Sequence, residues 1–100
     1  MITVTYHRLV QSDIQGICDY FDTKGDGLGD AFFAEFESVI EGIRRNPEKW
    51  PPIKEGRDKR KARFRRFPYV IVYRRIGESR VRIFVVKHKK RRETLGMRRR

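Results

Sequence analysis

The sequence predicts an α+β domain in which a helical hairpin packs on one face of a mostly antiparallel sheet. Three observations lead to this class. Residues 1–6 alternate like a strand, two segments with helical periodicity follow between residues 12 and 45, and three β-type segments lie in sequence between residues 57 and 86. A chain of 100 residues suits one domain, here 1–100, with a modest core.

The first expected element is an N-terminal strand over residues 1–6. It alternates Ile2, Val4 and Tyr6 with two threonines. A period of two among β-branched and aromatic residues is typical of a strand with one buried face. We therefore expect this strand to lie half-buried in the sheet.

The first helix is expected over residues 12–21. Its apolar residues recur on one helical face: Ile14, Ile17, Cys18 and Phe21. Ser12 followed three residues later by Gln15 has the spacing of a capping box, and Asp13 suits the positive end of the helix dipole. These residues predict a capped helix start at Ser12.

A glycine-rich turn and a second helix come next. Residues 23–29 carry glycines at positions 25, 27 and 29, which permit the backbone angles of a tight connection between helices. Apolar residues then recur three and four positions apart: Phe32, Phe33, Phe36, Val39, Ile40 and Ile43. The pair Asn46-Pro47 is expected to end this helix.

The remaining chain predicts a three-stranded antiparallel meander. The first strand is expected over residues 57–67, where the cations at 61, 63 and 65 alternate with Ala62, Phe64 and Arg66. Residues 69–73 read YVIVY as a central strand would, and residues 81–86 form the last strand after a hairpin at 77–79. Residues 96–100 are expected to be frayed.

Charge is distributed very unevenly along the chain. The formal net charge is +12, and residues 57–100 hold nineteen Lys and Arg against three Asp and Glu. Concentrating cations costs self-repulsion, which an anionic partner removes. The sequence therefore predicts one contiguous cationic platform that docks nucleic acid, a DNA-bound enzyme or an acidic protein segment.

Several functional classes are not expected. No apolar run is long enough for a membrane span and no signal peptide is visible, so we expect a cytoplasmic protein. One cysteine, Cys18, excludes an internal disulfide framework, and together with two distant histidines it cannot form a zinc site. We therefore expect neither a metal nor a cofactor.

One histidine is a candidate for catalysis. His88 stands among cations where the last strand ends. A neutral imidazole there could take a proton from a ribose 2′-hydroxyl while Arg91 stabilised the developing charge on the phosphate. The simpler interpretation is that His88 only contacts backbone or phosphate. Lys61, Arg63 and Arg65 would flank the same groove if their strand and the last strand exposed the same face of the sheet.

Two segments carry a family resemblance. The block RRFPYVIVYR at residues 65–74, and VKHKKR at residues 86–91, follow a strand, two helices and Asn46-Pro47. This order resembles the RelE/ParE superfamily of bacterial toxins, in its ParE-like, plasmid-stabilisation branch. The resemblance implies the toxin of a type II toxin-antitoxin pair, held inactive by a cognate acidic antitoxin.

The superfamily contains two activities with different residue requirements. ParE-like members poison DNA gyrase, whereas RelE-like members cut mRNA on the ribosome. The resemblance matches Lys61, Arg63 and Arg91 to cations of the nuclease site. However, Val70 stands where that site has a third-strand arginine, and Met97 where it has a tyrosine. Losing a transition-state cation and a stacking ring should slow RNA cleavage by orders of magnitude.

The sequence therefore favours a non-enzymatic gyrase inhibitor. Its expected target-binding residues are Arg63, Arg65, Arg66, Arg91 and Arg92. The alternative is a ribosome-dependent mRNA endoribonuclease, whose catalytic residues would be Lys61, Arg63, His88 and Arg91. An inactive relic or a general nucleic-acid-binding module stays open as a third interpretation.

Overall fold

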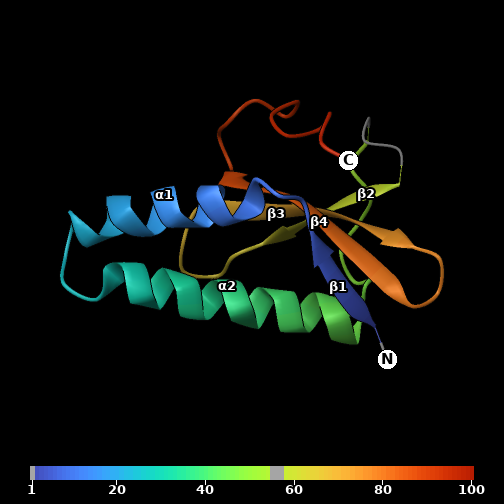
Figure 1. Cartoon of the computed structure of the whole chain (residues 1–100), viewed down its shortest axis with the longest axis horizontal. Coiled ribbons are helices and arrows are strands. Elements are labelled where there is room, and N and C mark those ends of the chain that lie inside the picture. Colours follow the sequence, from blue (N-terminus) through green and yellow to red (C-terminus); the bar gives the residue numbers. More distant parts are fainter. Residues whose placement is uncertain (1, 55–57) are drawn as a thin grey trace.

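The computed structural model describes residues 2–54 and 58–100. In chain order its elements are β1 (Thr3–Tyr6), α1 (Val10–Asp22), α2 (Leu28–Arg45), β2 (Lys59–Arg63), β3 (Tyr69–Ile76) and β4 (Arg80–His88) (Figure 1). This order confirms the α+β class with an N-terminal strand, a helical hairpin and three further strands. Met1 and Arg57, the expected starts of two strands, lie outside the described residues.

A four-stranded sheet has the spatial order β1-β4-β3-β2. Strands β2, β3 and β4 form the predicted antiparallel meander. Strand β1 joins the sheet beside β4 and runs parallel to it, with Thr3 opposite Arg80 and Tyr6 opposite Ile83. The sheet is therefore mostly antiparallel, and β1 and β2 form its two edges.

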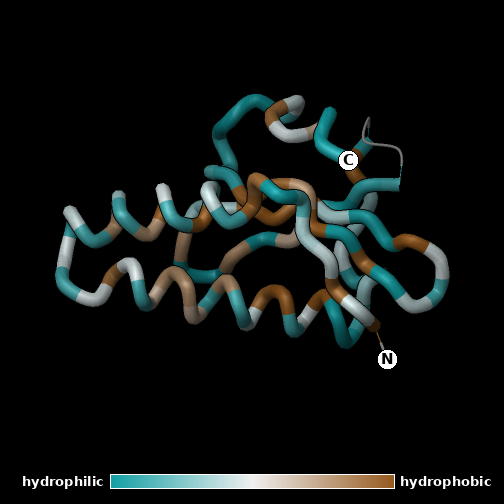
Figure 2. The backbone as a smooth tube through the Cα atoms, in the orientation of Figure 1, coloured by the Kyte–Doolittle hydropathy of each residue, from teal (hydrophilic) through white to brown (hydrophobic). Residues whose placement is uncertain are grey.

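Both helices lie side by side along one face of the sheet (Figure 1). Phe32 and Ile43 on α2 are fully buried, as are Ile71 and Ile83 on the central strands. Hydrophobic stretches recur along the helices and through β3 and β4 (Figure 2). The main core thus forms between the helical hairpin and the sheet, and its burial is the dominant stabilising term.

The predicted turn between the helices depends on two of its glycines. Gly27 has a φ of 78°, in the left-handed region that favours glycine. At Gly29 an added Cβ would lie 2.7 Å from the carbonyl oxygen of Cys18, so only glycine allows the helices to approach this closely. The Gly29 N–H also donates to the Asp22 carboxylate at 3.0 Å.

The capping box expected at Ser12 is not formed. Helix α1 begins at Val10, because the turn before it is fixed by His7: the His7 carbonyl accepts from the Val10 N–H, and the His7 Nδ1 accepts from the Leu9 N–H. The Ser12 hydroxyl instead donates to the Leu9 carbonyl at 2.9 Å. The helix therefore starts two residues earlier than predicted.

Strand β2 is shorter than the expected strand over residues 57–67. It ends at Arg63, and the chain then bends through Arg65 and Arg66 before β3 begins. The carboxylate of Glu35 on α2 accepts the backbone N–H groups of both arginines. Because those donors bond to Glu35, they do not extend the ladder between β2 and β3.

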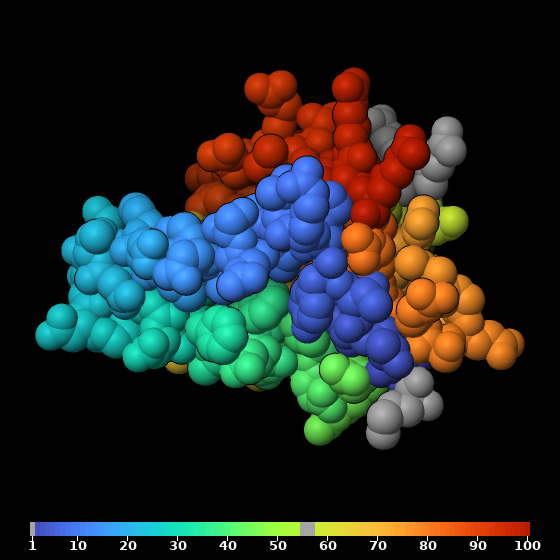
Figure 3. Space-filling view, viewed as in Figure 1, coloured from blue at the N-terminus to red at the C-terminus, as the bar shows by residue number. Residues whose placement is uncertain are grey.

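The second face of the sheet is covered by residues 91–100, here called the C-terminal segment. It lies across β3 and β4 from α2 (Figure 1) and packs against the start of α1 (Figure 3). The guanidinium of Arg99 donates to the Asp13 carboxylate at 2.7 Å and to the Phe84 carbonyl at 3.0 Å. The predicted fraying of residues 96–100 is therefore wrong.

Gly96 fixes the path of the C-terminal segment over the sheet. Its φ is 82°, and an added Cβ would lie 2.6 Å from the Cβ of Val85. The turn therefore needs glycine both for its backbone angle and for its close approach to β4. The Asp13 carboxylate, which accepts from Arg99, also accepts the Val86 N–H of β4 at 3.2 Å. Val86 follows Ile83, the last residue of β4 that pairs with β1.

Tyr73 provides a prediction about alkaline pH. Its buried hydroxyl donates to the Pro47 carbonyl at 2.7 Å, and burial raises its pKa to about 12 from an ordinary 10.0. A folded-state pKa above the unfolded value stabilises the fold fully below pH 10 and loses that contribution as the pH rises through 12. We expect an ultraviolet absorbance titration to show one tyrosine ionising last, and Tyr73→Phe to remove that step.

Candidate cationic interface

The strand registers bring the predicted cationic residues toward one end of the sheet. Arg63, at the end of β2, pairs with Val70, while Tyr69, at the start of β3, pairs with His88 at the end of β4. The Lys89 N–H then donates to the Pro68 carbonyl at 2.8 Å. The bend after β2 therefore lies next to the end of β4, and the end of β2 lies at the same end of the sheet with β3 between them.

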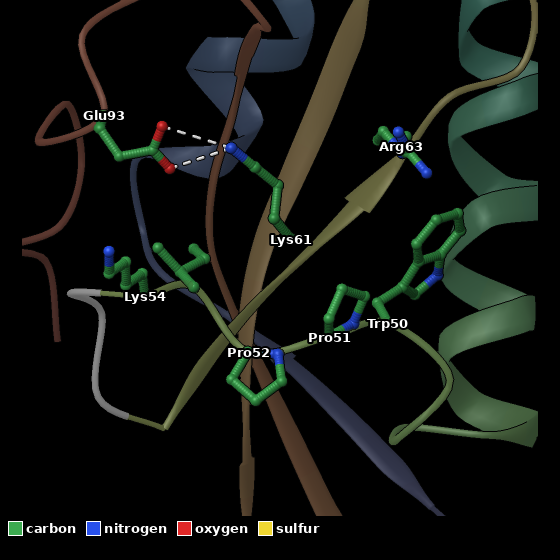
Figure 4. A pocket seen from close by; sticks show the side chains of 8 residues that line it. Trp50, Pro51, Pro52, Lys54, Lys61, Arg63 and Glu93 are labelled. Carbon is green, nitrogen blue, oxygen red and sulfur yellow. Dashed lines mark hydrogen bonds and ion pairs between the residues drawn. The ribbon is translucent and has the colours of Figure 1, made fainter.

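Lys61 and Arg63 share the face of β2 that points away from the helices. Between them Ala62 points the other way, into the main core, where it is fully buried. The two cations line a cavity of about 460 Å³, together with residues 50–54 and Glu93 (Figure 4). We call this cavity the linker groove, because residues 50–54 belong to the connection between α2 and β2.

Two contacts define the linker groove. The Lys61 ammonium lies 3.0 Å and 3.3 Å from the two carboxylate oxygens of Glu93, a residue of the C-terminal segment. The guanidinium of Arg63 lies over the indole of Trp50, 5.7 Å from the ring centroid. Lys61 is thus paired with an acid, and Arg63 is held by a cation–π contact.

A second hollow lies on the other side of Trp50, between α2 and the end of β2. Its lining includes Val39, Gly42, Arg45, Lys49, Trp50, Arg63 and Arg65. Arg63 lines both hollows and Arg65 lines the second. Beyond them, the guanidinium of Arg66 lies 5.8 Å from the ring centroid of Phe67. The structure therefore places three of the five expected target-binding arginines around the end of β2.

The other two expected target-binding residues belong to the C-terminal segment. Arg91 and Arg92 are exposed and line a cavity with Arg98 and Arg99. The Arg91 N–H donates to the His88 carbonyl at 3.0 Å, which fixes the turn leaving β4. Arginine side chains grouped in this way provide planar donors suited to carboxylates and phosphates.

The side chain of His88 is held by its neighbours. Its ring lies edge-on to Tyr69 with 5.2 Å between centroids, and its Nδ1 accepts the Lys90 N–H at 3.0 Å. In a neutral imidazole with this hydrogen bond the proton is on Nε2, so no lone pair is left for a general base. Catalysis by His88 would require release of the Lys90 N–H.

Sequence reasoning missed the structural role of Lys87. Lys87 falls just after the last strand as predicted, which ends at residue 86, yet it lies within β4 and is only 5% exposed. Its ammonium donates to the carbonyls of Arg92, Glu93 and Leu95 at 2.9, 2.9 and 3.0 Å. Burial lowers the Lys87 pKa, while Glu93 acts in the opposite direction. A signal was present: Lys87 follows Val85 at the period of two that marks one face of a strand.

The part of the chain that the structure describes offers little support for a metal site, a nucleophilic cysteine or a membrane span. Within residues 2–54 and 58–100, no three His, Cys, Asp or Glu side chains lie close enough together to hold a metal ion. Burial raises the pKa of the Cys18 thiol, and Asp22 raises it further, which opposes nucleophilic use of this cysteine. Neither described helix has the length and apolar character to cross a membrane.

Comparison with known proteins adds two findings. A family model described as the ParE toxin of the type II toxin-antitoxin system, parDE, matches residues 4–93. A solved structure described as "Chromosomal ParDE TA system from P. aeruginosa" contains a chain similar to this one, with a TM-score of 0.70 and 15% sequence identity. The match covers 88% of this chain and 96% of that chain, and at this identity it shows the fold. No curated protein matches.

Proposed function

The chain belongs to the ParE toxin family of type II toxin-antitoxin systems, and from this premise we propose that it inhibits DNA gyrase and that a cognate acidic antitoxin neutralises it. The observation that carries this proposal is the grouping of Arg63, Arg65 and Arg66 at one end of the sheet, with Arg91 and Arg92 on the segment that follows β4. Such a surface binds an anionic partner without chemistry of its own.

The residues at the nuclease positions support inhibition rather than cleavage. Val70, which stands in place of the nuclease arginine, is buried in β3 and has no charge to offer a phosphate. Met97, which stands in place of the tyrosine, has no aromatic ring, and its carbonyl accepts from Lys59 at 2.6 Å. His88 has its Nδ1 lone pair occupied. Lys61, Arg63 and Arg91 alone provide charge but neither base nor stacking platform.

An acidic antitoxin fits the charge of this protein. The net charge of +12 favours association with a partner of opposite sign and speeds their encounter. The similar solved chain comes from a ParDE toxin-antitoxin system, which supports the same kind of partner here. We propose that both gyrase and the antitoxin are met in the cytoplasm.

The test is a supercoiling assay with purified gyrase and relaxed plasmid. We expect micromolar protein to block supercoiling and to leave linear plasmid after denaturation, and we expect co-expressed antitoxin to prevent both effects. Ribosome-bound mRNA incubated in parallel should stay intact. Unaffected gyrase together with codon-resolved cuts in the mRNA would contradict the proposal and favour the endoribonuclease.

A further inference from the structure

We propose that the linker groove is a binding site for an extended acidic peptide, and that Glu93 occupies it as an internal competitor. The inference concerns the chemistry of the groove, and it stands whether or not gyrase is the target. It starts from an observed contact, because the carboxylate of Glu93 is already bound in the groove by the Lys61 ammonium at 3.0 Å.

The lining of the groove suits a peptide. Trp50, Pro51, Pro52 and Ile53 form an apolar wall, and Lys54, Lys61 and Arg63 place positive charge along it (Figure 4). An extended segment could lay apolar side chains on the wall while its carboxylates met the cations. Arg63 covers one face of Trp50, the only tryptophan of the chain, so that face is closed to a stacking nucleobase.

Glu93 is held in a way that allows its side chain to be displaced. Its backbone is fixed, because its carbonyl accepts from the buried Lys87 ammonium. Its side chain is 52% exposed and that of Lys61 is 34% exposed, and an ion pair this accessible to water is weak. A carboxylate of a partner could therefore replace Glu93 without releasing the C-terminal segment from the sheet.

The test uses Trp50 fluorescence of the full chain with a capped hexaglutamate peptide as the probe. We expect saturable binding that changes the Trp50 emission. Glu93→Gln should tighten binding about three-fold, since it removes both the competing ion pair and a like charge. Lys61→Gln should weaken binding about five-fold, since one charged contact is lost. Circular dichroism would show that each variant is folded.

Two matched controls separate the groove from general attraction to a basic protein. Glu78→Gln removes the same charge from the exposed turn between β3 and β4 and should leave the affinity unchanged. Lys24→Gln, at the helix turn, is the control for Lys61→Gln.

Three results would overturn the inference. The first is an equal gain in affinity from Glu93→Gln and Glu78→Gln, which would indicate an effect of net charge alone. The second is an unchanged Trp50 emission at saturating peptide. The third is tighter binding of a hexathymidylate than of hexaglutamate with the same response to Glu93→Gln, which would assign the groove to nucleic acid.

Discussion

Replacing Phe32 by alanine is expected to lower the free energy of unfolding by about 3 to 5 kcal/mol. Phe32 is fully buried on α2 and lies at the centre of an aromatic cluster. Its ring centroid lies 4.8 Å from that of Phe64, 5.1 Å from that of Tyr69, 5.2 Å from that of Phe67 and 5.7 Å from that of Phe21. Because these rings come from both helices and from the sheet, the cavity that the substitution leaves would weaken the packing of the helical hairpin on the sheet.

The neighbouring residue gives a matched control for this prediction. Phe33 is 42% exposed, so Phe33→Ala should cost under about 1 kcal/mol. Urea denaturation followed by circular dichroism measures both variants. A domain of this size has roughly 5 to 15 kcal/mol of stability, so the first variant should lose a large fraction of it. Equal losses in the two variants would contradict this description of the core.

Replacing Lys87 by methionine is expected to release the C-terminal segment from the sheet and to cost about 2 kcal/mol of stability. The change keeps an unbranched side chain one atom shorter but removes the ammonium that donates to three carbonyls of the segment. A buried carbonyl without a hydrogen-bond donor costs free energy, so the segment would detach and let water solvate these groups. We expect at least a tenfold faster amide hydrogen exchange at Leu95, Met97 and Arg99, whose N–H groups bond within this segment.

Lys89→Met serves as the control, because Lys89 is exposed and its backbone N–H, which the change keeps, donates to the Pro68 carbonyl. It should leave amide exchange in the segment unchanged. A second variant, Gly96→Ala, should loosen the segment without removing a charge, since the new Cβ would collide with Val85. Slow exchange in both Lys87→Met and Gly96→Ala would show that the segment is held by something else.

Local periodicity predicted most of the fold. The helical spacing of Phe32, Phe36, Ile40 and Ile43 and the continuous run at residues 69–73 each reflect burial of one or both faces of a single element. In residues 2–6 the alternation holds for Ile2 and Val4, which pack against the core, but Tyr6 at the end of β1 is 43% exposed. These patterns need no knowledge of distant residues. They also identified the bend at Pro68 and the hairpin at Gly77, whose φ is 66°.

Long-range contacts account for what the sequence did not predict. The early start of α1 depends on the backbone and side chain of His7, and the short β2 depends on Glu35, thirty residues before Arg65. The order of the C-terminal segment rests on Lys87 and on Asp13, which is 86 residues from Arg99. No local pattern reveals such partners, and an arginine-rich end resembles a solvated tail.

The sequence predicted which cations form the candidate site, but not which residues those cations contact. The cations were expected along the second strand and after the last strand, and the structure places them there. That Lys61 is paired with Glu93, that Arg63 lies over Trp50, and that Lys87 is buried all follow from the return of the C-terminal segment across the sheet. Their role in target binding stays a prediction.

Inhibition of gyrase by charge-matched variants tests most directly whether the cationic end of the sheet is the docking surface. The double variant Arg63→Gln with Arg65→Gln should raise the concentration needed to block supercoiling at least tenfold, because two contacts of about 1 kcal/mol each are lost. The control Lys24→Gln with Arg80→Gln removes the same charge elsewhere and should inhibit like the unaltered protein. Equal inhibition by both double variants would contradict the account.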